Sequence, residues 1–389
     1  MSSIIYTVKA KTIGIINSLV TKRDSIYLFS SFLYKDNIHA ILDELLRNNV
    51  NDTYEIFCDG PAFSNYSAKN LIIVEHGSLK SLIAFWRSKY IIYDIGIYGQ
   101  IKGGKNQILI NTWHGTSLKR IEYYLDKNHR KGMPPLCTYS IAYSDFFQPI
   151  IKKAFGLDDK HVLITGEPRN DYLFEEGRTS ILDKLGIGYS GKKLVIWMPT
   201  WRQNKEHQDE NDGAIYQLGI PLLEANDLET LNETCKKNNI ILMIKWHGLQ
   251  ERGSINEEAY NNIKFLTSES IACTGKPLYH LVGCCDALIT DYSSIYVNFL
   301  VLDRPICFAY DDIDEYKQNR GFMFDNVESI MPGMHVHDFQ GIIDFLTSIG
   351  NDEGELISCS KRQEVNKILN AYSDNRNSYR LLKAINLIS

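Results

Sequence analysis

The sequence predicts an α/β protein of two domains, each built around a mainly parallel β-sheet. Three observations support this prediction. The 389 residues are too many for one ordinary domain core. Short runs rich in β-branched and aromatic residues alternate along the whole chain with segments of helical periodicity. Apolar residues make up 44% and charged residues 23% of the chain, which is usual for a globular protein.

The predicted strands are short, and many of them run into polar or glycine residues. In the first half of the chain they cover residues 26–30, 54–58, 71–75, 90–94, 108–113, 139–143 and 161–165. In the second half they cover residues 194–198, 240–246, 263–266, 287–290 and 305–310. Between them, residues 37–48 and 222–238 have apolar residues at three-and-four spacing and are expected to be helical.

The Gly- and Lys-rich stretch 186–193 is the predicted domain boundary. It divides the chain into a first Rossmann-like domain, residues 1–188, and a second one, residues 189–389. The second would include the C-terminal helices.

Charge and hydropathy exclude several classes of protein. A net charge of -5 provides no general attraction to nucleic acid, so any phosphate must be held by local basic groups. No stretch is apolar for long enough to span a bilayer, and the start of the chain lacks the features of a signal peptide. Eight cysteines include no Cys-x-x-Cys pair, which suits a reducing compartment. We therefore expect a cytoplasmic protein without a nucleic-acid partner.

Polar and glycine clusters follow six predicted strands at their carboxyl ends. They begin at His114, Gly166, Pro199, His247, Asp291 and Asp311. In open α/β sheets, ligands bind outside the carboxyl ends of the strands. Each cluster alone is better explained by a helix cap or a structural histidine. Six of them in one chain favour a binding edge on each sheet.

The residues at these strand ends suit a nucleotide diphosphate. The side chains that can pair with phosphate oxygens or donate hydroxyls to them are Arg169, Arg202, Lys245, Thr116, Ser293 and Ser294. Two such edges facing each other across a cleft form a GT-B-like arrangement of two Rossmann-like domains. Arg202 also has a simpler explanation, an ion pair with a neighbouring carboxylate.

Five segments, in this order, resemble the CDP-glycerol glycerophosphotransferases and related CDP-ribitol transferases of wall teichoic-acid and capsule synthesis. They are NTWHGTSLKRI (111–121), TGEPRNDYLF (165–174), WMPTWR (197–202), IKWHG (244–248) and TDYSSIYVNFLVLDRPICFAYDDIDEYKQNRGF (290–322). In addition, SSFLYKDNIHAI (30–41) is similar to the first strand-to-helix junction of that family. The resemblance extends over roughly residues 26–335 and implies a GT-B fold with the site in its cleft. It also implies that the first domain lies on the acceptor side of this site and that the second holds the CDP-activated donor.

The resemblance also implies which residues contact the substrates. The implied substrate-binding positions are Trp113, Gly115, Thr116, Ser117, Arg169, Pro199, Thr200, Arg202, Lys245, Trp246, Asp291, Ser293, Ser294 and Asn298. Three positions depart from the family pattern. Ser117 and Gly248 stand where the family usually has proline, and Asn298 stands where it usually has aspartate. These departures leave the identity of the transferred polyol open.

The implied reaction is attack of an acceptor hydroxyl on the β-phosphorus of a CDP-polyol, with CMP as the leaving group. An alcohol is a poor nucleophile near neutral pH, so a base is needed, and His114 is assigned that role. His247 would help to hold the pyrophosphate and stabilise charge on the leaving CMP. The pattern leaves an exchange of the two histidines' roles open. Asp291 would orient His247 or, more simply, cap the following helix.

No metal or cofactor is expected. His335 and His337 share a short stretch, but no carboxylate or cysteine cluster accompanies them at ligand spacing. Two other functions are alternatives. One is a GT-B glycosyltransferase or epimerase that uses a nucleotide sugar, and the other is a degenerate assembly subunit without activity. The intact histidine and basic positions argue against the second.

Residues 1–23 contain four basic residues and no acidic one. The basic residues are Lys9, Lys11, Lys22 and Arg23, and apolar residues at mostly helical spacing are Ile4, Ile5, Val8, Ile15, Ile16 and Leu19. Such a segment could lie on the anionic inner leaflet, close to a lipid-linked or polymeric glycan acceptor. It could equally form a helix packed on the first domain, or a strand with exposed lysines.

Overall fold

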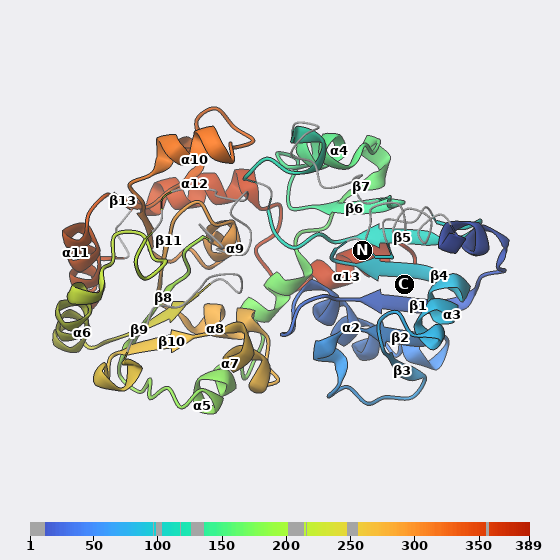
Figure 1. The fold of residues 1–389 in the computed structure, drawn as a ribbon, viewed down its shortest axis with the longest axis horizontal. Coiled ribbons are helices and arrows are strands. Elements are labelled where there is room, and N and C mark those ends of the chain that lie inside the picture. Colours follow the sequence, from blue (N-terminus) through green and yellow to red (C-terminus); the bar gives the residue numbers. More distant parts are fainter. Residues whose placement is uncertain are drawn as a thin grey trace.

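The computed structural model describes residues 12–95, 97–98, 103–116, 118–125, 136–200, 214, 216–246, 256–354 and 358–389. Figure 1 shows two lobes side by side, each with a central sheet flanked by helices. The arrowheads of β1 (Arg23–Phe29) and β10 (Ile263–Leu266) both point toward the middle of the molecule (Figure 1). The carboxyl ends of the two sheets therefore face each other.

The first sheet has seven strands in the order β3-β2-β1-β4-β5-β6-β7, and every pair is parallel. After β1, its strands are β2 Glu55–Asp59, β3 Leu71–Val74, β4 Ser88–Tyr93, β5 Ile108–Asn111, β6 Tyr139–Ala142 and β7 Val162–Ile164. Helix α2 (Asn37–Arg47) covers one face and α3 (Leu79–Arg87) covers the other, each through its own buried apolar cluster. Helix α4 (Gln148–Phe155) packs beside β6 and β7.

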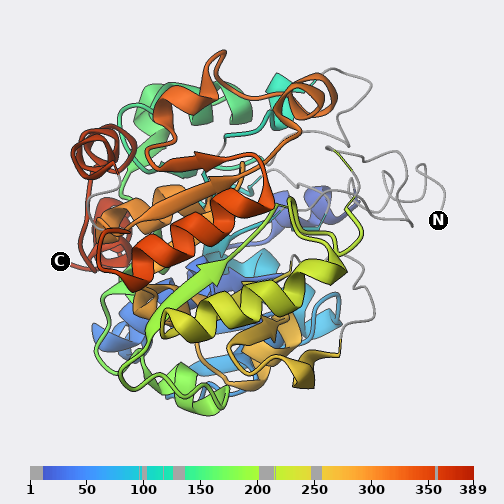
Figure 2. The same ribbon diagram turned by 90° about the vertical axis from the view of Figure 1, so that its left-hand side faces the viewer.

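The second sheet has six parallel strands in the order β10-β9-β8-β11-β12-β13. Besides β10, its strands are β8 Lys193–Trp197, β9 Ile240–Lys245, β11 Ala287–Thr290, β12 Ile306–Ala309 and β13 Met334–Val336. Helices α6 (Leu228–Lys237) and α11 (Phe339–Gly350) pack on one face. The other face carries α8 (Leu278–Cys284), α9 (Ile295–Phe299) and α12 (Cys359–Leu369). The turned view in Figure 2 shows α6 and α11 in front of the second sheet.

The remaining helices are short or lie at the ends of domains. They are α5 Ser180–Lys184, α7 Ser268–Cys273, α10 Ile313–Asn319 and α13 Asn377–Ala384. The 3-10 helix η5 (Pro168–Leu173) follows β7 and packs against helices of both lobes. One apolar cluster extends through this region, because Tyr143 and Tyr172 of the first lobe pack with residues of α8 and α9. The two domains are therefore joined by a buried apolar interface.

The last helix returns to the first domain. Leu381 and Leu382 of α13 are buried with residues of β1 and α2, so α13 does not join the second domain as the sequence predicted. The carboxylate of Asp171 in η5 accepts hydrogen bonds from the backbone N–H groups of Asn377 and Ser378 at 2.8 and 2.9 Å. Both connections between the domains thus meet at the start of α13. The predicted boundary near residue 188 lies between β7 and β8 and stays a prediction.

Twelve strands lie where the sequence predicted them, within three residues at each end. The pattern missed β13, which has only three residues and contains His335. The helix expected over 222–238 begins at Leu228, since a 3-10 turn, Ala225–Asp227, precedes it. Among the described residues, no helix combines the length and apolar character needed to cross a bilayer.

Candidate active site

The loop after β1 brings the two sheet edges into contact. The ring of Phe32 lies 6.3 Å from that of His114 in the first domain. Two residues later, the ring of Tyr34 lies 5.5 Å from the Nζ of Lys245 in the second domain. The same loop ends at Asp36, which caps α2 and accepts a hydrogen bond from the backbone of Asn37 at 2.8 Å. One short segment therefore contacts the predicted base and a predicted phosphate-binding lysine.

Arg169 occupies the centre of this region and is paired on two sides. Its Nη1 lies 3.2 Å from each carboxylate oxygen of Asp36, and its Nη2 lies 2.9 Å from Oε1 of Glu167. Its guanidinium lies 4.7 Å from the ring centre of Tyr279 in α8. All three charged groups are buried. Arg169 thus compensates two buried carboxylates. A direct contact with the donor, which the sequence predicted, stays a prediction.

Asn298 of α9 extends this network into the second domain. Its side-chain amide donates to Glu167 and, at 2.8 Å, to Oδ1 of Asn170, and its Oδ1 accepts from the hydroxyl of Tyr279 at 3.0 Å. The residue is fully buried, and both amide protons are used. The structure gives Asn298 a bridging position between the domains. Its predicted influence on polyol choice would have to act through these partners.

His114 lies in the loop after β5. Its Nδ1 is out of contact with solvent and has no hydrogen-bond partner among the described residues. Burial lowers the pKa of the imidazole to about 4, and the charge of Arg169 adds to this effect. The backbone of Asp94 and the carboxylate of Asp36 act in the opposite direction. The ring is therefore neutral near physiological pH and has a nitrogen that can take up a proton.

Lys245 ends β9 and is only 5% exposed. Its ammonium donates to the carbonyl of Trp246 at 3.3 Å and, as far as the described residues go, forms no ion pair. Burial lowers its pKa to about 8, so it remains largely charged near neutral pH. A buried cation without a carboxylate partner is costly in the free protein and suits an anionic ligand. Lys245 is the described cation that best fits the phosphate-binding role.

Gly115 brings the histidine loop against the second domain. A Cβ atom at this position would lie 2.9 Å from Oγ of Ser294 and 3.3 Å from Nη2 of Arg169, and its φ of +145° also disfavours a side chain. The hydroxyl of the next residue, Thr116, is buried and makes no hydrogen bond within the described part of the chain. Ser293 and Ser294 directly precede α9, and both side chains are partly buried. These predicted residues come together where the domains meet.

Asp291 organises the turn after β8. Its carboxylate accepts hydrogen bonds from the backbone N–H of Thr200 at 3.0 Å and from the Thr200 hydroxyl. Pro199 and Thr200 are buried beside it. Asp291 therefore holds a loop of the neighbouring strand in place. His247, which Asp291 was expected to orient, lies outside the described residues.

The two predicted tryptophans have different positions. Trp113 has a positive φ of 55°, unusual for a bulky residue, and its ring lies 4.2 Å from that of His114. Trp246 is buried in the core of the second domain, where its ring stacks on Phe265 and its Nε1 donates to the carbonyl of Leu218 at 3.2 Å. Its indole is committed to packing, so the predicted substrate contact would have to come from its backbone.

Several predicted positions fall outside the described residues. They are Ser117, Arg202, His247 and Gly248.

Four residues of this region were not predicted as part of a site. They are Tyr34, Asp36, Asp94 and Glu167. Asp94 directly follows β4 beside His114, accepts a hydrogen bond from Ser30 at 2.7 Å, and has its pKa raised to about 7 by burial. Asp94 is the last residue of the predicted strand 90–94, and Asp36 directly precedes the predicted helix 37–48. The same strand-end rule that selected His114 could therefore have found them.

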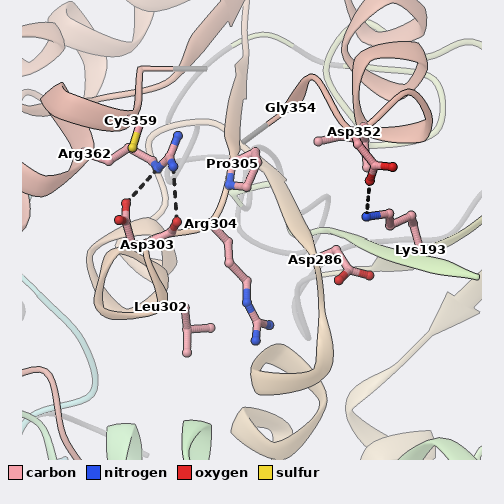
Figure 3. Close-up of a pocket in the computed structure, with 11 residues that line it drawn as sticks. Lys193, Asp286, Leu302, Asp303, Arg304, Pro305, Asp352, Gly354, Cys359 and Arg362 are labelled. Carbon is pink, nitrogen blue, oxygen red and sulfur yellow. Dashed lines mark hydrogen bonds and ion pairs between the residues drawn. The ribbon is translucent and has the colours of Figure 1, made fainter. Parts of the chain in front are cut away.

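A cavity of about 370 Å³ lies at the opposite, amino-terminal edge of the second sheet (Figure 3). Two ion pairs line it: Lys193 lies 2.6 Å from Asp352, and Arg362 lies 3.2 Å from Asp303. No predicted site residue lines it. Elsewhere in the described ranges, no group of three or more His, Cys, Asp or Glu side chains could hold a metal ion.

Comparison with known proteins agrees with this geometry. The family of CDP-glycerol:poly(glycerophosphate) glycerophosphotransferases matches residues 13–387. The chain belongs to this family. It is 28% identical over 370 residues to the teichoic acid poly(glycerol phosphate) polymerase of Bacillus spizizenii, covering 89% of this chain and 88% of that protein. It is 26% identical to the teichoic acid ribitol-phosphate polymerase TarL of Staphylococcus aureus, with 89% and 59% covered.

The fold matches that of a solved family structure. The wall teichoic acid polymerase TagF superposes with a TM-score of 0.77 at 22% identity, covering 98% of this chain and 94% of that chain. The predicted GT-B-like pair of parallel-sheet domains is thereby confirmed. Membership also confirms the predicted class of enzyme, a transferase that uses CDP-activated polyol phosphates.

The different surroundings of Arg169 and Lys245 predict different effects of removing each charge. Arg169→Ala leaves Asp36 and Glu167 buried without their partner, so we expect the free energy of unfolding to fall by roughly 3–5 kcal/mol. Lys245→Met removes an ammonium that has no carboxylate partner among the described residues. It should leave stability nearly unchanged and weaken CDP-glycerol binding by roughly 1.5–3 kcal/mol. Urea unfolding and titration calorimetry measure the two effects.

Matched controls are Arg380→Ala and Lys236→Met, which change partly or largely exposed ion pairs with Asp374 and Glu233. Neither should change either quantity by more than about 1 kcal/mol. Wild-type stability of Arg169→Ala together with weakened donor binding would show instead that Arg169 contacts the donor phosphates.

Proposed function

We propose that this protein transfers glycerol phosphate or ribitol phosphate from a CDP-activated donor to a hydroxyl of a teichoic-acid or related envelope glycan. The acceptor oxygen forms a bond to the β-phosphorus of the donor, the bond between that phosphorus and the bridging oxygen breaks, and CMP leaves with this oxygen. The observation that carries the proposal is a neutral, partly buried histidine and a buried lysine, which has no carboxylate partner among the described residues, on the two sheet edges that face each other.

His114 is the base in this proposal. Its neutral ring can accept the proton of the attacking hydroxyl, and its Nδ1 has no competing partner among the described residues. In the free protein, burial and Arg169 hold its pKa well below neutrality. The negative charge of a bound donor acts in the opposite direction and moves the pKa toward neutrality, where general-base catalysis is most efficient. Arg169 in turn holds the surrounding loop through Asp36 and Glu167.

Lys245 stabilises the negative charge that develops on the leaving CMP. Its position at the carboxyl end of β9 is the place where an open α/β sheet binds ligands. Ser293 and Ser294 directly precede α9, and their hydroxyls would donate to the same phosphates. His247 and Arg202 stand two residues after Lys245 and Thr200 in the sequence and are proposed as further phosphate ligands. An exchange of roles between His114 and His247 is decided by the His114 variant described below.

The polyol and the acceptor are tested by a product assay. The purified protein is incubated with CDP-glycerol, CDP-ribitol, UDP-N-acetylglucosamine or no donor, together with soluble and lipid-linked glycan acceptors. Mass spectrometry should show addition of a polyol phosphate and release of CMP. Addition of a sugar from the UDP donor would favour the glycosyltransferase alternative. Absence of any product, with all substrates shown to be intact, would favour the non-enzymatic assembly subunit.

His114→Ala should lower turnover by roughly two to four orders of magnitude, because it removes the general base. Donor binding should change little, since Lys245 and the serines remain. In the wild type, kcat/KM should fall as pH drops through about 4, where the His114 imidazole becomes protonated. Between this pH and neutrality, kcat/KM should show no second change from the titration of His114. Steady-state kinetics across this range measure both effects. Near-normal turnover of His114→Ala would transfer the base role to another residue.

We also propose that the N-terminal segment holds the protein at the inner membrane surface. Residues 12–19 are helical, and their inner side packs on the first domain: Ile13 is buried, and Asn17 donates to Gln107 at 2.9 Å. The outer side exposes Ile15 by 63% and Leu19 by 80%. Lys22 donates to the carbonyl of Trp86 and is thus directed inward. The packed-helix and membrane alternatives are compatible, because they use opposite sides of one helix.

The membrane proposal predicts that Ile15→Ser combined with Leu19→Ser reduces binding to vesicles containing anionic lipid, while stability is unchanged. Each exposed apolar side chain that enters the membrane interface contributes roughly 1.5–3 kcal/mol to the free energy of membrane binding, and the double variant loses both contributions. Flotation assays at low and high salt measure the binding. The control is Ile368→Ser, an exposed apolar residue on α12 of the other domain. Equal flotation of all three proteins would contradict the proposal.

A further inference from the structure

A second histidine lies at the same edge of the first sheet as His114. His76 follows β3, and its Nδ1 lies 2.9 Å from Oδ2 of Asp59, the last residue of β2. The imidazole is held on its ring faces as well. Its ring centre lies 4.9 Å from that of Phe29 and 5.0 Å from that of Tyr98, with Tyr98 nearly parallel to it. Three residues from three segments thus orient one side chain.

This arrangement leaves the distal nitrogen of His76 unused. The side chain is 49% exposed, and Nε2 makes no hydrogen bond to a described residue. Gly77 beside it faces open space and has a positive φ of 75°. An imidazole fixed through Nδ1 presents Nε2 in one defined direction, as functional histidines do. A histidine needed only for packing would not have to be held so firmly while half of it faces solvent.

Asp59 and Tyr98, which contact His76, each have a feature that folding alone does not explain. Asp59 is fully buried and accepts from Tyr27 and, at 2.9 Å, from Ser81, yet its Oδ1 has no partner among the described residues. Tyr98 has a positive φ of 47°, an uncommon conformation for an aromatic residue. Unpaired buried polar atoms and strained residues gather at functional sites. Here both lie directly behind the half-exposed imidazole.

The surroundings favour an anion. Helix α3 begins three residues after His76, at Leu79, and has no acidic residue in its first turn. The amino end of a helix carries partial positive charge and backbone N–H groups that attract anions. The exposed ring nitrogen of His76 adds a further polar group beside them. A phosphate group is the anion that the reaction supplies.

The location relates His76 to the reaction centre. In the order β3-β2-β1-β4-β5, the strands that precede His76 and His114 are four steps apart, which corresponds to about 19 Å at the usual strand spacing. One segment connects the two positions. Phe29 lies against His76, and Phe32, three residues later, lies near His114. A chain-like acceptor lying along this edge would reach both histidines with different parts.

We propose that His76, oriented by Asp59, binds a phosphate of the acceptor substrate at a distance from the reacting hydroxyl. This inference rests on the proposed function, in which the acceptor carries phosphates. Two parts of the acceptor could supply this phosphate group: a phosphodiester of the polyol-phosphate chain, or the diphosphate that links a glycan to its lipid. His76 is a binding residue in this proposal and takes no part in proton transfer.

The test compares His76→Ala and His76→Asn with the wild type. Asparagine retains a donor for Asp59 and lacks the distal nitrogen, so it separates anion binding from support of the fold. His161→Ala is the matched control. Its ring centre lies 5.7 Å from that of Tyr139 and its Nδ1 lies 3.8 Å from Asp158, but it stands at the amino-terminal edge of the same sheet. Unfolding temperatures establish that all variants are folded.

Kinetics are measured with two acceptors: a soluble oligomer of several polyol-phosphate units without lipid, and a lipid-diphosphate glycan without polyol phosphate. Both His76 variants should raise the acceptor KM about ten- to a hundredfold, the loss of one charge-assisted contact. kcat and the donor KM should not change, and the effect should shrink with rising salt. An effect on the first acceptor assigns the site to the chain, and an effect on the second assigns it to the lipid diphosphate.

Unchanged KM values for both acceptors in both folded His76 variants would overturn the proposal. Failure of the proposed function would look different, because the wild type would then transfer no polyol phosphate at all. In that case, calorimetric titration with the soluble oligomer still tests the site. Binding by the wild type that both His76 variants lose, and that His161→Ala retains, would support it. Equal binding by all four proteins would exclude it.

Discussion

The arrangement of the reaction centre depends on the guanidinium of Arg169 between two buried carboxylates. Asp36 caps the helix that covers the first sheet, and Glu167 precedes the segment that crosses to the second domain. Both carboxylates would be too costly to bury without a cation between them. The same cation acts on His114 and helps to keep its imidazole neutral. A single group therefore sets the position of the loops and the protonation state of the proposed base.

From this centre the polar network continues across the domain interface. Glu167 accepts from Asn298, and Asn298 also contacts Tyr279 and Asn170, so residues of both domains share one set of hydrogen bonds. The closeness of Gly115 and Ser294 requires the same alignment. Lys245 is the exception within this network, since its charge is left without a described carboxylate. The buried charges around Arg169 thus compensate one another, whereas the charge of Lys245 is available to an anionic ligand.

Most of the fold could be predicted because parallel strands buried on both faces are short continuous apolar runs. The strand-end rule also located His114, Lys245 and Ser294, whose positions depend only on where a strand stops. The partners of Arg169 could not be predicted in this way, since Asp36 lies 133 residues earlier in the chain. The same is true of α13, whose cap, Asp171, lies 206 residues before Asn377. Pairings across such distances leave no local pattern in a single sequence.

The meeting of both interdomain connections at Asp171 has a mechanical consequence. The chain passes from the first domain to the second through η5 and returns between α12 and α13, and the carboxylate of Asp171 ties the two passages together. A rotation of the two domains about this point would move residues less the closer they lie to it. Because the apolar interface and the hydrogen bonds of Asn298 lie beside the same point, the region around Arg169 and Glu167 would stay nearly still in such a rotation.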